Sequence, residues 1–130
     1  MNFIIACATD DGINFVGRHF GDADYYNIYE MNSEGYTLIG VVNNTTEEEE
    51  THADPKKAKG ISQILKSKNV NVVMTKVFGP NIKRIRKTFV SVISKENTII
   101  DSINLLVTKF ELLEKTFNDG EERDLIKLSH

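Results

Sequence analysis

Runs of apolar residues along the chain predict five strands. Residues 3–8, Phe-Ile-Ile-Ala-Cys-Ala, are all apolar, so both alternating sets of side chains would be buried and the run predicts a central strand covered on both faces. Two aromatic and β-branched runs, Tyr25–Met31 and Tyr36–Val42, are separated by Asn-Ser-Glu-Gly and predict an antiparallel hairpin. Shorter apolar runs at Val70–Met74 and Val90–Ile93 predict two further strands.

Helical spacing of apolar residues predicts three helices. The first follows Asp54-Pro55, an N-cap with a proline at the first helical position, and extends to about Lys68. The second follows Gly79-Pro80. The third begins at the capping box of residues 98–101 and runs as one long helix through Leu113. Because strands and helices alternate, we expect an α/β domain with a mixed sheet in which the hairpin supplies the antiparallel strand.

Composition limits the domain count and the classes of partner. A chain of 130 residues that is 40% hydrophobic suits one domain, which we place at residues 1–116, followed by a charged C-terminal tail at 117–130. The net charge of -3 and pI near 5.6 give no general attraction to nucleic acid or to an anionic membrane. The apolar runs are too short for a signal peptide or a membrane span, and the single cysteine cannot form an internal disulfide. Both features favour a cytoplasmic protein.

The loop after the first strand is the candidate site. Residues 10–21 contain two aspartates, three glycines and a histidine, more turn residues and polar groups than packing requires. Ligands of α/β sheets bind beyond the carboxyl ends of the strands, so this loop and Gly79-Pro80-Asn81 should face a common crevice. The backbone N–H groups that begin the second helix could receive an anion there. Alternatively, the glycines only permit tight turns.

Five motifs, in this order, resemble the dinitrogenase iron-molybdenum cofactor biosynthesis family over about residues 1–115. They are Asp10-Asp11-Gly12, His19-Phe20-Gly21, the aromatic strand Tyr25–Tyr29, Lys57-Ala58-Lys59-Gly60 and Gly79-Pro80. The resemblance implies a ribonuclease H-like motif, a three-layer α/β/α fold with a five-stranded mixed sheet and one antiparallel strand. Characterised members of that family, which are nitrogenase accessory factors and similar carriers, bind, carry or insert iron-molybdenum cofactor or its iron-sulfur precursors, and many others have no established role.

The resemblance also implies a set of site residues. The family's cluster-binding histidine corresponds to His19, and a neutral imidazole can ligate iron or molybdenum. The implied cofactor-binding residues are Gly12, Gly17, Arg18, His19, Phe20, Gly21, Gly79, Pro80 and Asn81. His52 and Cys7 are secondary metal ligands, although solvent exposure and core packing explain them more simply.

The chain departs from the family pattern at two places near these residues. Arg18 stands where the family usually has a smaller or polar residue, and Thr75-Lys76-Val77-Phe78 replaces a more glycine-rich approach to Gly79. Arg18 and Lys76 could attract an anionic cluster or simply face water.

Three functions remain open at this point. The first and favoured one is a non-catalytic carrier of a metal cluster or another anionic small ligand, with cofactor-assembly proteins as candidate partners. The second is a Mg²⁺-dependent phosphoryl-transfer enzyme in which Asp10 and Asp11 hold the metal; it is weaker because the other carboxylate cluster, Glu47–Glu50, suits a solvated loop. The third is a partner-binding module that uses the basic helix face Lys83, Arg84, Arg86 and Lys87.

Overall fold

The computed structural model describes residues 1–45 and 55–129, with side chains from residue 60 onward in the second range. The predictions made for His52, for the Glu47–Glu50 run and for the cap at Asp54 lie outside these residues. The described strands are β1 (Phe3–Thr9), β2 (Tyr25–Asn32), β3 (Gly35–Asn43), β4 (Val72–Thr75), β5 (Val90–Ser94) and β6 (Ile126–Leu128). The described helices are α1 (Pro55–Ser67), α2 (Ile82–Thr88), α3 (Ile99–Val107) and α4 (Phe110–Asn118), with short 3-10 turns η1 (Phe20–Asp22) and η2 (Gly120–Glu122).

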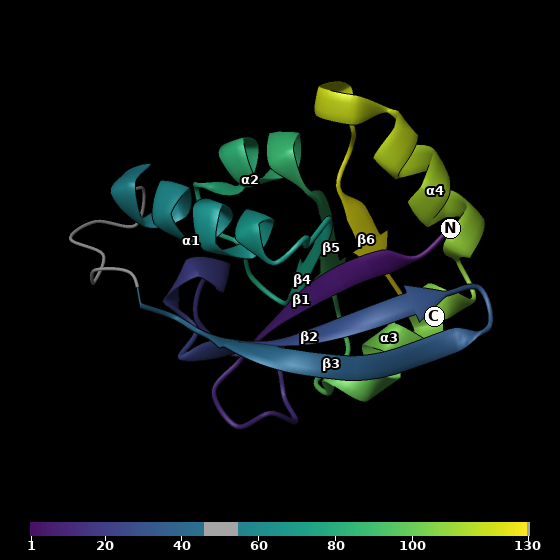
Figure 1. Cartoon of the computed structure of the whole chain (residues 1–130), viewed down its shortest axis with the longest axis horizontal. Helices are drawn as coiled ribbons and strands as arrows, with labels where there is room; N and C mark the ends of the chain where they lie inside the picture. The colour runs from purple at the N-terminus through teal and green to yellow at the C-terminus, as the bar shows by residue number, and fades with distance from the viewer. Residues whose placement is uncertain (46–54, 130) are drawn as a thin grey trace.

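The described strands form one mixed sheet in the order β3-β2-β1-β4-β5-β6 (Figure 1). β2 runs antiparallel to both of its neighbours, β1 and β3, while β1, β4, β5 and β6 pair in parallel. The predicted α/β class, with a mixed sheet and one antiparallel strand, is therefore confirmed. The hairpin turns at residues 32–35, where the Asn32 side chain accepts a hydrogen bond from the backbone N–H of Glu34 at 2.8 Å.

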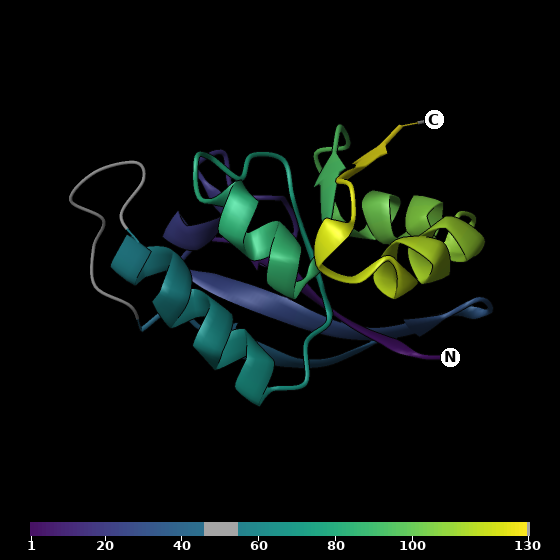
Figure 2. The ribbon, with the colours of Figure 1, turned by 90° about the horizontal axis from the view of Figure 1, so that it is seen from above.

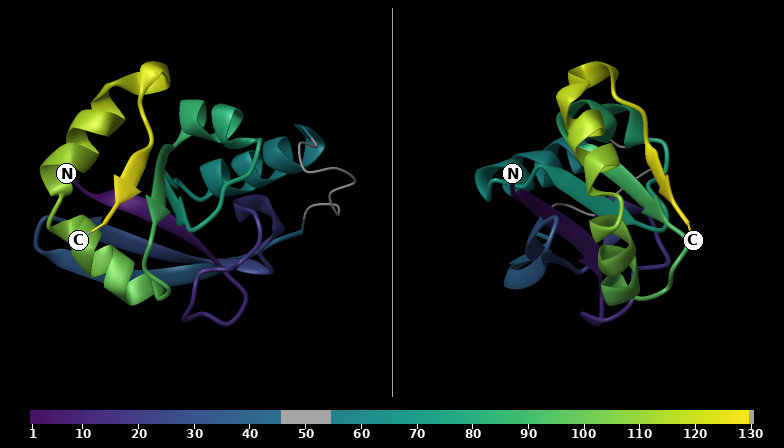
Figure 3. Two further views of the ribbon diagram at one scale, coloured as in Figure 1. Left: turned by 180° about the vertical axis from the view of Figure 1, so that it is seen from behind. Right: turned by 90° about the vertical axis from the view of Figure 1, so that its right-hand side faces the viewer.

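Helices cover the sheet on both faces, which gives the three layers expected. Along β1, Phe3, Ile5 and Cys7 belong to the core beneath α3 and α4, whereas Ala6 and Ala8 belong to the core beneath α1 and α2. Figure 2 shows α1 and α2 side by side toward one end of the molecule and α3 and α4 toward the other, and Figure 3 shows the same arrangement from two further sides. Both alternating sets of β1 side chains are buried, as the apolar run predicted.

The prediction of one long third helix is wrong, because the chain breaks between α3 and α4. The backbone N–H groups of Thr108 and Lys109 bond three residues back, to Leu105 and Leu106 at 3.1 and 2.9 Å. The Thr108 hydroxyl also donates to the Leu105 carbonyl at 2.6 Å, a competition that favours ending a helix. After the break, Phe110 and Phe117 of α4 each pack edge-on against Phe3, with ring centroids 5.5 Å apart.

The sheet has a sixth strand, β6, instead of the five expected. Ile126 and Leu128 are buried and Lys127 between them is exposed, so this short segment is an ordinary sheet edge with one outward charge. Residues 117–129, described from sequence as a charged tail, therefore contribute the end of α4, the η2 turn and a strand of the same sheet. Three residues flanked by charges are too few for the alternation to be recognised in the sequence.

The buried side chain of Arg123 holds this last segment in place. Its guanidinium donates to the carbonyls of Thr116 and Phe117 near the end of α4, and to those of Arg86 and Lys87 near the end of α2. The Arg86 guanidinium in turn donates to the Arg123 carbonyl. Orphan carbonyls at two helix ends are thereby satisfied by one cation.

None of the described helices is long and apolar enough to cross a membrane.

Candidate functional site

The two candidate loops leave the same edge of the sheet. β1 and β4 are parallel neighbours with Cys7 opposite Met74, so the segment after Thr9 and the segment after Thr75 begin side by side. This is the arrangement that the sequence predicted from the alternation of strands and helices. The structure brings His19 of the first loop against Gly79 of the second.

The imidazole of His19 lies directly on the backbone of Gly79. A Cβ atom built at Gly79 would fall 2.6 Å from Nδ1, 2.7 Å from Cγ and 2.9 Å from Cε1 of that ring, closer than any side chain tolerates. Gly79 also has a φ of +80°, which glycine adopts without strain. Residue 79 is therefore glycine for two reasons, and both place the half-buried His19 ring in the contact between the loops.

An aromatic cluster holds the two loops together beneath His19. The buried ring of Phe20 packs between Tyr26 and Phe78, with centroid distances of 5.0 and 5.4 Å. The Tyr26 hydroxyl donates to the Phe20 carbonyl at 2.8 Å, and burial raises the pKa of that phenol. Because Phe20 follows His19 and Phe78 precedes Gly79, this cluster fixes the neighbours of both contacting residues.

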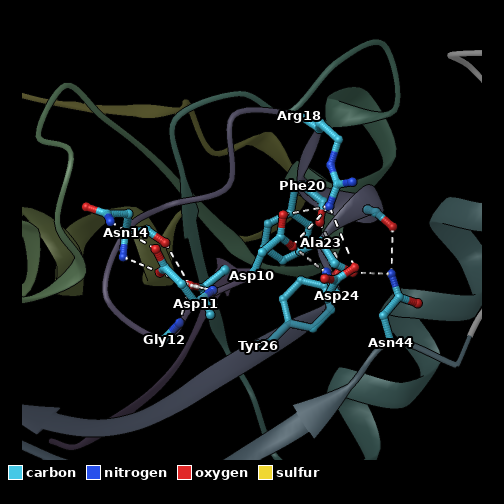
Figure 4. A network of polar contacts seen from close by, with 12 residues as sticks. Asp10, Asp11, Gly12, Asn14, Arg18, Phe20, Ala23, Asp24, Tyr26 and Asn44 are labelled. Atoms are coloured by element: carbon cyan, nitrogen blue, oxygen red, sulfur yellow. Dashed lines mark hydrogen bonds and ion pairs between the residues drawn. The ribbon is translucent and has the colours of Figure 1, made fainter.

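Arg18 is paired with the carboxylate of Asp10. One guanidinium nitrogen lies 3.0 and 2.8 Å from the two Asp10 oxygens and 3.8 Å from Asp24, while Asp10 also accepts from the Asp24 backbone N–H at 2.8 Å. Figure 4 shows this network beside the Asn44 amide, which donates to the carbonyls of Gly21 and Ala23. The Arg18 charge is therefore largely balanced within the loop. The sequence had left open whether Arg18 attracts an anionic cluster, and this pairing weakens that attraction.

Asp11 serves the turn that begins the first loop. Its carboxylate accepts hydrogen bonds from the backbone of Ile13 and Asn14, at 2.9 and 2.8 Å, and from the Asn14 amide at 3.0 Å. The bonds from Asn14 and Ile13 lower the pKa of this carboxyl to about 2. Gly12 follows with a φ of +80°, and its carbonyl accepts from the Asn27 amide at 3.1 Å.

This geometry does not favour the magnesium enzyme. Asp10 is engaged by Arg18 and Asp11 by the turn, so the two carboxylates do not converge on one point. Within residues 1–45 and 55–129, no group of three or more His, Cys, Asp and Glu side chains could hold a metal ion.

Cys7, the secondary ligand that the structure describes, is not brought to His19. The Cys7 thiol is fully buried in the core beneath α3 and α4, and burial raises its pKa, which keeps it a neutral and unreactive thiol. Phe20 and Phe78, in contrast, belong to the core beneath α1 and α2. His52 lies outside the described residues.

The start of α2 is less open to an anion than predicted. The backbone N–H of Ile82 donates to the Gly79 carbonyl at 3.2 Å, and the helix has only seven residues. Lys76, the second candidate cation, donates to the Asn97 side chain at 2.6 Å. Pro80 and Gly17 are exposed, and a Cβ atom at Gly17 would meet nothing within 4 Å.

Thr75 is a site feature that sequence reasoning named only as part of a departure from the family pattern. It ends β4 four residues before Gly79 and is fully buried, and its hydroxyl is the buried side-chain polar atom that finds no partner among the described residues. Alternation along β4 places it on the same face as Val73, the face that packs beneath α1 and α2 with Phe20 and Phe78. A buried hydroxyl without a partner is costly.

Comparison with known proteins shows the family and the fold. Residues 1–109 match the family model described as dinitrogenase iron-molybdenum cofactor. A crystal structure from Methanocaldococcus jannaschii, solved under the provisional name of a dinitrogenase, is similar at 19% sequence identity and a TM-score of 0.60, over 84% of this chain and 91% of that one. At this identity the likeness concerns the fold. Among curated proteins, none is similar enough in sequence to count as a match.

Proposed function

Because the chain belongs to the dinitrogenase iron-molybdenum cofactor family, we propose that it is a non-catalytic carrier of an iron-molybdenum or iron-sulfur cluster, or of a precursor of one, with His19 as the protein ligand. The observation that supports this most directly is the seating of the His19 ring on Gly79, between the loops that follow β1 and β4. An imidazole held in this way keeps its orientation, and a neutral imidazole nitrogen can ligate iron or molybdenum.

The surroundings of His19 suit a cargo that is taken up and released. A metal cluster bound through one imidazole can exchange, whereas a resident metal centre is normally held by three or four protein ligands. The Thr75 hydroxyl, which finds no partner among the described residues, lies on the same sheet face as the aromatic cluster beneath the loops. Arg18 is balanced by Asp10, and Asp11, Asp22 and Asp24 leave this segment net negative, so the ligation itself, and not charge attraction, would select the cargo.

The experiment is an anaerobic titration of the purified protein with iron-molybdenum cofactor and, separately, with a [4Fe–4S] cluster, followed by visible absorption. His19→Ala should weaken uptake about tenfold or more, the loss typical when a metal site loses a ligand or its orienting group. His52→Ala and Cys7→Ala, which change the two secondary candidates, should leave uptake unchanged. Equal uptake by His19→Ala and the native protein would overturn the proposal, and a loss confined to His52→Ala would move the ligand to that residue.

The phosphoryl-transfer alternative is not proposed, because the bonds made by Asp10 and Asp11 within the loop account for both side chains. The partner-binding alternative depends on the basic helix face and is developed below.

A further inference from the structure

The charges of this protein are separated along the chain. Residues 55–95 contain eleven of the 16 lysines and arginines and none of the 19 acidic residues. The rest of the chain holds five basic residues and every aspartate and glutamate. The net charge of -3 for the whole chain therefore does not reveal this basic segment.

The fold places much of this positive charge on one outer surface. Segment 55–95 supplies both helices of one layer, α1 and α2, which contact each other and lie side by side in Figure 2. We call the exposed basic residues of this layer the basic surface; they are Lys66, Lys68, Lys83, Arg84 and Lys87.

The side chains of the basic surface are not neutralised within the described part of the chain. The ion pairs recorded there involve Arg18 and Lys115, and Arg86 of α2 is half-buried and occupied with the Arg123 carbonyl. None of the five residues of the basic surface makes a side-chain hydrogen bond or ion pair with a described residue. Unpaired and exposed charges of one sign attract a partner of the opposite sign over several ångströms.

The α2 part of the basic surface borders the candidate site, whereas Lys66 and Lys68 lie at the end of α1 that leads to Asn71, which bonds Ile4 near the start of β1. α2 begins three residues after Gly79, and α1 contacts the η1 turn that directly follows His19. A partner seated on these two helices would therefore reach the loops that hold the His19 ring.

We propose that the basic surface docks an acidic protein. This protein is the donor or the acceptor of the cargo carried at His19, an identification that rests on the proposed function. Single-stranded nucleic acid is disfavoured because both aromatic residues of the segment, Phe78 and Phe89, are buried and offer no stacking surface. A membrane is disfavoured because the large apolar side chains of the two helices, such as Ile61, Leu65 and Ile85, are buried against the sheet and leave no apolar face to insert. Docking by charge would be fast and weak, as a hand-over between two carriers requires.

The test measures binding of the whole protein to a fluorescent glutamate homopeptide by anisotropy, at about 50 mM and about 300 mM NaCl. The triple variant Lys83→Glu, Arg84→Glu and Lys87→Glu removes the α2 part of the basic surface. The matched control, Lys109→Glu, Lys115→Glu and Lys127→Glu, changes the same number of charges on α4, its N-cap and β6. Both variants therefore have the same net charge.

The native protein should bind the peptide, and binding should weaken with salt. The α2 variant should lose about tenfold or more in affinity, while the control stays within about threefold. Equal losses in the two variants, or no binding by the native protein, would overturn the proposal. The proposal would also be overturned if the native protein bound a DNA duplex or phosphatidylserine vesicles more tightly than the peptide and lost this binding in the α2 variant. The DNA or the vesicle would then be the favoured partner.

The two proposals fail separately. The α2 variant should take up cluster as the native protein does, and His19→Ala should bind the peptide as the native protein does. A folded α2 variant, checked by thermal unfolding, that keeps full peptide affinity counts against the acidic partner and leaves the carrier intact.

Discussion

At the scale of single residues, the contact between His19 and Gly79 is the most specific feature of the molecule. Two independent constraints require glycine at position 79. Its backbone is left-handed, and the His19 imidazole occupies the space that a side chain at this position would need. The ring therefore depends on glycine for its position, and not only on its own loop.

Gly79→Ala should destabilise the protein and displace the His19 ring. The strained φ and the overlap with the ring together should cost about 1–3 kcal/mol of unfolding free energy, measured by urea unfolding, and cluster uptake should fall with the ring's displacement. Gly17→Ala, in the loop of His19, is the matched control, because a Cβ atom there meets nothing; it should change stability by less than about 1 kcal/mol. Equal stability of the two variants would contradict the role given to Gly79.

Asp11 should make stability depend on acid. Its pKa is about 2 when folded, against 3.8 for the free carboxyl, so its contribution is fully present above about pH 4 and is lost as the pH falls through about 2. Asp11→Asn, which is neutral at every pH, should differ from the native protein most at neutral pH, and the difference in Tm should shrink between about pH 4 and about pH 2. Asp124→Asn, an exposed carboxylate near β6, controls for loss of a negative charge. A difference that stays constant with pH would refute the assignment.

Some of these residue contacts follow from the sequence and some do not. That His19 and Gly79 lie on neighbouring loops follows from strand order and the rule for carboxyl ends of parallel strands. The pairing of Arg18 with Asp10, the Phe20 and Phe78 contact and the unpaired Thr75 hydroxyl depend on side-chain directions within irregular loops. No periodicity reports those directions, because loops have none.

At the scale of elements, one buried arginine joins the ends of two helices to the last strand. Arg123 lies among four carbonyl oxygens from α2 and α4 or their immediate ends, and burial lowers its pKa. An isolated arginine among acidic neighbours in the sequence reads as a solvent-exposed residue, which is why the tail seemed unstructured.

Arg123→Ala should cost about 2–4 kcal/mol of unfolding free energy, because the carbonyls at two helix ends lose a charged donor in a buried place. Arg84→Ala removes an exposed arginine of α2 and should cost less than about 0.5 kcal/mol. Urea unfolding followed by circular dichroism measures both. An Arg123→Ala variant as stable as Arg84→Ala would show that β6 is held by its apolar residues alone.

Element types and order were predictable where the pattern was strong, and the boundaries were not. β1 to β5 and the first two helices follow from apolar periodicity and from Gly and Pro positions. The break at Thr108 was missed because Ile103, Leu106, Phe110 and Leu113 keep helical spacing across it, so the apolar pattern alone continues the helix. The hydrogen bonds that end α3, from Thr108 and Lys109 to carbonyls three residues back, are made by the backbone. The pattern of side chains therefore does not report them.

At the scale of the whole molecule, the two helical layers differ in charge. The β1 strand lies between β2 and β4 and is covered by helices on both faces, so the candidate loops are attached to the best-packed part of the sheet. One helical layer, α1 and α2, carries the basic surface, whose α2 part lies beside those loops, while α3 and α4 cover the opposite face. The proposed cargo site and the proposed docking surface thus share one side of the sheet.

The basic surface also gives the molecule a positively charged side despite its net negative charge. A protein with such a side can present it to a negatively charged resin. At neutral pH, above its pI near 5.6, the protein should therefore be retarded on a cation-exchange column at low ionic strength.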